Sequence, residues 1–166
     1  GQTLVSKADW KWNSLDEWAE DLETEGISLN VAAQVGNAAL RVAAGAKQDG
    51  EATNDQLGIM KKLAIDSVEQ GAFSLSTGLS LAPSAYATTD EIIELCKAIS
   101  GYEGVFYVTH ARVGPGRHIS MIEEAVEIGQ KADIPVQFSH MAITDWRHYG
   151  KGPEMIRVIE KAREES

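Results

Sequence analysis

Two short runs decide the fold, Val105-Phe-Tyr-Val-Thr-His110 and Ile134-Pro-Val-Gln-Phe-Ser-His140. Both are rich in β-branched and aromatic residues, which favour strands, and both end at a histidine. Between them, the segment 120–132 carries apolar residues at helical spacing. A strand, a helix and a second strand in this order predict two neighbouring parallel strands, because a parallel pair needs a crossover connection. We therefore expect His110 and His140 at the carboxyl ends of neighbouring strands, on the same edge of one sheet.

The alternation of strands and helices continues along most of the chain. Three of the expected helices begin at capping boxes, in which Ser14, Thr53 and Thr88 are each followed three residues later by Glu or Gln. We expect an α/β fold, a partial TIM-type (β/α) barrel with about four parallel strands and covering helices, because eight strands take about 250 residues. The expected strands are 27–35, 72–76, 105–109 and 134–139, and the expected helices are about 14–26, 53–71, 88–99, 120–132 and 153–164.

The composition is that of an ordinary globular protein. Of 166 residues, 43% are hydrophobic and 24% are charged, so we expect one domain with its own core over 1–166. The net charge of −10 argues against general binding of nucleic acids or anionic membranes, because both need a basic surface. The sequence contains no run of about 18 apolar residues, so it predicts no membrane span. The single cysteine cannot form a disulfide within the chain, and no signal peptide is visible, so we expect a cytoplasmic location.

The two strand-end histidines are candidate metal ligands. Neighbouring strands lie about 4.8 Å apart, so two imidazoles there can reach a common zinc ion at about 2.0–2.1 Å each. A zinc site takes four ligands, and the sequence contains no His-x-His and no convincing third ligand. The alternative is that His110 and His140 are structural, partly buried histidines.

Other polar side chains lie near these strand ends. Arg112 follows His110 by two residues, and its guanidinium could hold a carboxylate or form a surface salt bridge. Ser76 and Thr77 bring hydroxyl groups to another strand end, where they could bind a ligand or cap the next segment. The remaining candidates are expected to have ordinary roles, as solvated loop residues for His118, His148 and Asp145 and as a core residue for Cys96.

Several motifs in order resemble those of one family, the N-acyl-D-amino-acid deacylases (D-aminoacylases) of the amidohydrolase superfamily. The most specific motif is Gly71-Ala-Phe-Ser-Leu-Ser-Thr-Gly-Leu79, together with the two histidine strand ends. The resemblance runs from Trp10 to Arg163, nearly the whole chain. The other segments that carry it are Leu29-Asn-Val-Ala-Ala-Gln-Val-Gly36, Leu40-Arg41, Tyr149-Gly150-Lys151 and Ala162-Arg163.

The resemblance implies a metal-dependent barrel that hydrolyses the amide bond of an N-acyl-D-amino acid, with one or two zinc ions. Only two of the family's metal ligands map onto this chain, at His110 and His140. The family's His-x-His and cysteine ligands would lie before Gly1, and its aspartate, which is also the general base, would lie beyond Ser166. No catalytic residue is therefore expected within this chain, which we expect to be inactive by itself.

The resemblance also bears on the substrate. The expected substrate contacts are Arg112, Ser76 and Thr77. The family usually has Tyr and Lys, expected to hold the substrate carboxylate, where this chain has Leu81 and Ala142. Arg112 is then the main cation left for a carboxylate.

Two other interpretations stay open. One keeps the barrel and the metal but changes the substrate to another amide or a cyclic amide. The other is a non-catalytic α/β domain with structural histidines. As partners we expect a small-molecule N-acyl amino acid, no nucleic acid and no membrane. The open sheet edges of a partial barrel also predict a homodimer that pairs those edges.

Overall fold

The computed structural model describes residues 11–46 and 49–165, and the described residues fall into two compact units that divide after Val31. Within the first unit lies helix α1 (Leu15–Glu25). It begins where the hydroxyl oxygen of Ser14 accepts a hydrogen bond of 3.1 Å from the backbone N–H of Glu17, as the capping box predicts. It ends at Gly26, whose φ of 79° favours glycine. The candidate site belongs entirely to the second unit.

The second unit is built on one sheet of four parallel strands in the order β1-β2-β3-β4. This confirms the predicted α/β fold with four parallel strands. The strands are β1 (Gln34–Gly36), β2 (Ser74–Gly78), β3 (Phe106–His110) and β4 (Val136–Ser139). The helices are α2 (Asn37–Ala43), α3 (Asn54–Glu69), α4 (Thr89–Ile99), α5 (Ser120–Ala132) and α6 (Gly152–Glu164), with short 3-10 helices η2 (Ser84–Tyr86) and η3 (Trp146–His148).

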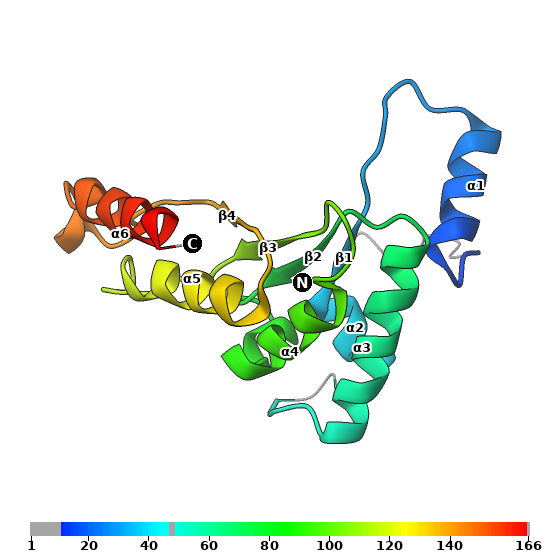
Figure 1. Ribbon diagram of the computed structural model, residues 1–166, viewed down its shortest axis with the longest axis horizontal. Coiled ribbons are helices and arrows are strands. Elements are labelled where there is room, and N and C mark those ends of the chain that lie inside the picture. Colours follow the sequence, from blue (N-terminus) through cyan, green and yellow to red (C-terminus); the bar gives the residue numbers. More distant parts are fainter. Residues whose placement is uncertain (1–10, 47–48, 166) are drawn as a thin grey trace. The chain divides into compact units, whose positions relative to one another are not determined.

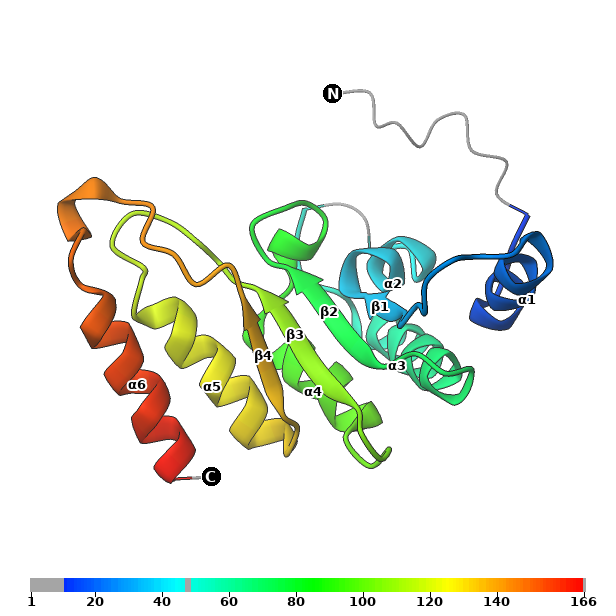
Figure 2. The ribbon, with the colours of Figure 1, turned by 90° about the horizontal axis from the view of Figure 1, so that it is seen from above.

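Helices cover one face of this sheet. Helices α3, α4 and α5 pack side by side along it, and α6 packs against α5 (Figures 1 and 2). Each contributes fully or nearly fully buried side chains, such as Met60 of α3, Ile92 of α4 and Ile128 of α5. Burying one such side chain stabilises a fold by about 1.5–3 kcal/mol. These side chains belong to the core of the second unit. Among the described residues, no helix is both long and apolar enough to cross a membrane.

The first strand differs most from its prediction. The sequence predicts a strand over 27–35, but β1 has only three residues, and the apolar side chains of Ile27, Leu29 and Val31 are exposed. Within the described residues β1 lies at an edge of the sheet and pairs only with β2, over 34–36. An apolar run does not specify a strand partner, and residues 27–33 form no strand and leave these side chains exposed, so the prediction is wrong over most of this range. The other strands lie within two residues of their expected positions.

Candidate metal centre

The structure brings the two strand-end histidines together. His110 is the last residue of β3, where it pairs in register with Ser139 of β4, and His140 follows directly. The centroids of the two imidazole rings lie 4.8 Å apart, with 67° between the ring planes. His110 is half-buried and His140 is exposed, so the pair faces solvent at the carboxyl edge of the sheet. Active sites of (β/α) barrels lie at this edge.

The backbone at His140 is unusual. Its φ of 56° lies in the left-handed region, which residues other than glycine occupy at a cost of about 1–2 kcal/mol. β4 ends at Ser139, so this conformation lies where the chain leaves the strand. Such conformations cluster at functional sites.

The donor chemistry of the pair fits part of a zinc site. Neutral imidazole is a preferred ligand of zinc and of other late first-row metals. His110 and His140 would supply two of the usual four ligands. Over 11–46 and 49–165, no three His, Cys, Asp or Glu side chains are placed to hold a metal ion together. The described residues therefore fit two positions of a zinc site and leave the others to groups outside them.

The two predicted hydroxyl contacts, Ser76 and Thr77, lie on opposite faces of β2. Thr77 is buried, and its hydroxyl is 2.8 Å from the hydroxyl of Tyr107 and 3.4 Å from that of Thr109. Burial raises the pKa of Tyr107 to about 12, so this cluster is neutral. Because side chains alternate along a strand, Ser76 shares the opposite face with His110. The structure therefore favours Ser76 over Thr77 as a contact for a ligand at the histidine pair.

Arg112 already has partners within the chain. Its Nε donates to Glu124 Oε1 at 2.9 Å, its Nη1 donates to the carbonyl oxygen of Ala85 at 2.9 Å, and its Nη2 donates to that of Ala87. The Arg112 side chain is only 18% exposed. Its predicted contact with a substrate carboxylate stays a prediction. The ion pair with Glu124 matches the salt-bridge alternative, although it is mostly shielded from solvent, whereas the two bonds to backbone carbonyls have no signal in the sequence.

His118 is buried, which corrects the prediction of a solvated loop residue. Neither ring nitrogen has a hydrogen-bond partner; Nε2 lies 3.8 Å from Glu154 Oε2 of α6, and the ring centroid lies 4.8 Å from that of His148. His148 in turn shares a hydrogen bond of 3.1 Å with Asp145. The side chains beside its ring, His148 and Glu154, come from later elements, so no local signal could have revealed its burial.

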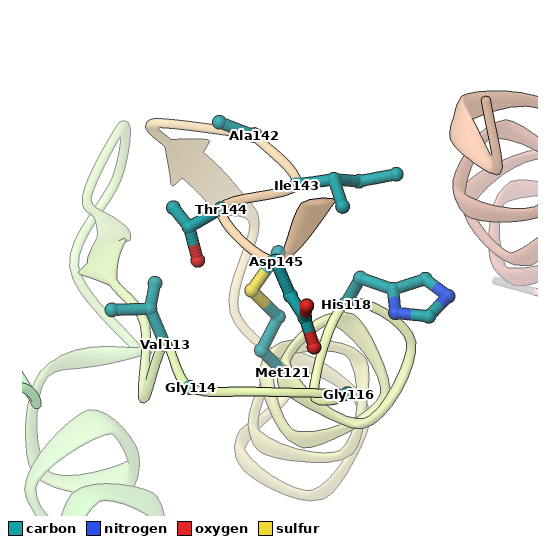
Figure 3. A pocket seen from close by; sticks show the side chains of 9 residues that line it. All are labelled: Val113, Gly114, Gly116, His118, Met121, Ala142, Ile143, Thr144 and Asp145. Carbon is teal, nitrogen blue, oxygen red and sulfur yellow. The ribbon is translucent and has the colours of Figure 1, made fainter. Parts of the chain in front are cut away.

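A small pocket lies beside His118. It measures about 10 Å³, enough for about one water molecule. Figure 3 shows its walls, which come from the loop after β3, the start of α5 and the loop after β4. Neither His110 nor His140 lines it.

Cys96 is a core residue, as the sequence predicts. It is fully buried on α4, and burial raises the pKa of its thiol to about 12. A thiol held neutral in this way is a poor metal ligand, because metals bind the thiolate.

The relatives of the chain point to one class of enzyme. It is 33% identical to the D-aminoacylase of Alcaligenes xylosoxydans xylosoxydans over 96% of its own length and 33% of that protein. It is 32% identical to the N-acyl-D-aspartate deacylase of the same organism, over 92% of its own length and 31% of the relative. The chain therefore spans about a third of the length of these relatives. No family model matches it.

Solved structures agree with the sequence relatives. A crystal structure of D-aminoacylase, described as defining a novel subset of amidohydrolases, matches with a TM-score of 0.85 and 33% identity over 90% of this chain and 31% of that one. A D-aminoacylase structure that concerns its binuclear metal center matches equally well. The N-acyl-D-glutamate deacylase of Bordetella bronchiseptica, complexed with zinc and a phosphonate inhibitor, has a TM-score of 0.86 and 25% identity over 92% of this chain and 32% of that one.

These likenesses cover nearly all of the chain, and the solved structures share its fold. They cover only about a third of each relative. The chain is therefore homologous to one part of the barrel of the N-acyl-D-amino-acid deacylases, which are amidohydrolases.

Proposed function

We propose that the protein containing these residues is a zinc-dependent hydrolase that cleaves the amide bond of N-acyl-D-amino acids. The observation that carries the proposal is the pair of imidazoles, His110 and His140, 4.8 Å apart at neighbouring strand ends. The pair lies in a segment homologous to D-aminoacylases. The expected partner is a small N-acyl amino acid, and a cytoplasmic location stays a prediction.

The chain supplies part of the machinery for this reaction. His110 and His140 would hold one or two zinc ions together with ligands from outside the described residues. Held by these histidines, the metal would supply polarisation of the substrate's amide carbonyl. Ser76 shares the face of His110 and offers a hydroxyl to the substrate, whereas Thr77 and Arg112 are engaged within the chain. No residue of this chain is proposed as the general acid or base, so we expect the 166 residues alone to be inactive.

The decisive experiment uses the complete gene product. We expect it to contain zinc and to release the free amino acid from N-acetyl-D-amino acids but not from the L-enantiomers. His110→Ala and His140→Ala should each lose bound zinc and at least about 100-fold in kcat/KM, because each removes a metal ligand. His148→Ala is the matched control, since this partly buried histidine lies in η3 and contacts Asp145 rather than His110 or His140, and it should keep both zinc and activity.

Three results would contradict the proposal or redirect it. Zinc content unchanged in both His110→Ala and His140→Ala would remove the histidine pair from the metal site. Activity on cyclic amides in place of N-acyl-D-amino acids would change the substrate class while keeping the metal chemistry. A protein with neither zinc nor amidase activity would favour a non-catalytic domain with structural histidines.

A further inference from the structure

We propose that Arg112 is a positioning residue, whose guanidinium fixes the loop 79–87 beside His110 at the carboxyl edge of the sheet. This loop connects β2 to α4 and contains η2. The inference deepens the proposed function, on which it rests for the statement that the catalytic site lies at this edge.

The guanidinium of Arg112 connects three separate parts of the fold. Each of its three nitrogens donates one hydrogen bond, to Glu124 on α5 and to the backbone carbonyls of Ala85 and Ala87 in the loop. The ion pair is mostly shielded from water, with side-chain exposures of 18% for Arg112 and 12% for Glu124. Charge-assisted bonds in such surroundings are stronger than those of exposed pairs. Arg112 therefore ties the end of β3 to the loop and to α5.

Glu124 extends this connection to the helix that follows the loop. The same oxygen, Oε1, that accepts from Arg112 also accepts a hydrogen bond of 2.9 Å from the hydroxyl of Thr89, the first residue of α4. Arg112 therefore holds the loop at Ala85 and Ala87. Glu124, which pairs with Arg112, also holds the start of α4 two residues later.

The beginning of the loop is held by the segment around His110. The backbone N–H of Leu79 donates to the carbonyl oxygen of His110 at 2.9 Å. The hydroxyl of Ser80 donates to the carbonyl oxygen of Ala111 at 2.8 Å and accepts from the N–H of Val113 at 3.2 Å. Both ends of the loop are therefore bonded to residues 110–113, the segment that carries the candidate metal ligand His110.

The middle of the loop is held by the first residue of α2, Asn37. Ser84 is buried, and its hydroxyl donates to the side-chain oxygen of Asn37, whose amide donates to Glu91 at 3.3 Å. Glu91 forms a buried ion pair with Arg41. Between these anchors, Leu81 stays 65% exposed. The loop is therefore fixed at its anchors while this side chain stays exposed.

The geometry requires arginine at position 112. The planar guanidinium offers five N–H donors in a rigid arrangement, which suits one carboxylate and two carbonyls at once. A lysine ammonium is a single point on a flexible chain and cannot meet all three acceptors in this arrangement. Lysine should therefore keep the charge at this position but release the loop.

The first test measures the loop itself in the complete gene product. Hydrogen exchange, read on peptides, should become at least about 10-fold faster over 79–87 in Arg112→Lys and in Glu124→Gln, while peptides of α3 stay unchanged. Thr89→Val removes only the hydroxyl bond to Glu124 and should give a smaller increase in the exchange rate over 79–87. This variant replaces Arg112→Lys in the test if Arg112→Lys fails to fold. Unchanged exchange over 79–87 in both Arg112→Lys and Glu124→Gln would overturn the proposal. This readout needs no activity, so it decides the proposal even if the proposed function fails.

The second test separates positioning from substrate contact. A displaced loop should lower kcat/KM by about 10- to 100-fold in Arg112→Lys, equally for an N-acyl-D-amino acid and for its uncharged carboxamide. Added guanidinium should restore part of the activity of Arg112→Ala, and zinc content should stay unchanged. A loss confined to the substrate with a free carboxylate, with unchanged exchange in the loop, would assign Arg112 to substrate binding and overturn the proposal.

Discussion

Asp145, in the loop after β4, illustrates how a single side chain organises a surface segment. Its carboxylate accepts from the backbone N–H of Arg147 at 3.1 Å and from the guanidinium of Arg147 at 2.9 and 3.0 Å, and it shares a further bond with His148. The guanidinium of Arg147 holds the pKa of this carboxyl well below its ordinary value. The charged form is therefore favoured in the folded state.

This pKa shift predicts a pH dependence of stability. A carboxyl with a lowered folded-state pKa stabilises the fold above its unfolded pKa of about 3.9, and this contribution is lost as the pH falls through the folded value. Asp145→Asn should therefore unfold at lower urea concentration than the wild type at pH 7. The gap between their midpoints should shrink as the pH falls below about 4. A gap that stays constant from pH 7 to pH 3 would contradict this assignment.

Single residues also show what a sequence reveals about a site. His110 and His140 are predictable because each lies at the end of a β-prone run, and the order of strands brings such ends together. The three partners of Arg112 come from segments 12 to 27 residues away, so its internal bonds have no local signature. The sequence around His118 likewise contains no feature that distinguishes this buried histidine from an exposed loop histidine.

Helix α5 approaches β4 unusually closely, and glycine makes this possible. A Cβ atom added at Gly129 would lie 2.6 Å from Val136 Cγ2 and 3.2 Å from the carbonyl oxygen of Ile134. The second neighbour is backbone at the start of the connection to β4, so the helix itself would have to shift. This contact fixes the spacing between α5 and the strand that precedes His140.

Two glycine substitutions should therefore have opposite effects. Gly129→Ala should destabilise the fold by about 1 kcal/mol, because overpacking outweighs the gain in helix propensity. Gly58→Ala on α3 is the matched control, since an added Cβ there meets nothing within 4 Å, and it should stabilise the fold by about 0.5–1 kcal/mol. Chemical unfolding of both variants measures the difference. Stabilisation by Gly129→Ala would show that α5 can move away from β4.

Helix boundaries were predicted more accurately than those of strands. Thr53 forms the complete capping box with Gln56, and α3 begins at the next residue, as expected. Helix α5 spans the predicted 120–132 without change. A cap is a local device, readable within four residues. The start of a strand depends on a partner elsewhere in the chain, which is why β1 is much shorter than its apolar run.

Within the described residues, the four-stranded sheet has two outer strands, each paired on one side only. These strands are β1 and β4, and β4 begins with exposed Val136 and Gln137. Unpaired strand edges favour association with another strand. We therefore propose that the isolated 166-residue chain forms a homodimer through these edges.

Light scattering tests the dimer directly. The isolated chain should have twice its mass of 18.0 kDa. Gln137→Lys should shift the mass toward one chain, because an inward-facing or edge charge opposes strand pairing. A wild-type mass of one chain at all concentrations would rule out the edge pairing.

The left-handed backbone at His140 has a consequence for directed evolution. Glycine adopts this conformation without the steric cost that a histidine side chain carries. A library selected only for thermal resistance should therefore enrich glycine at position 140, whereas selection for turnover should retain histidine. The residue found at position 140 after selection would therefore show whether the population had been selected for thermal stability or for catalytic turnover.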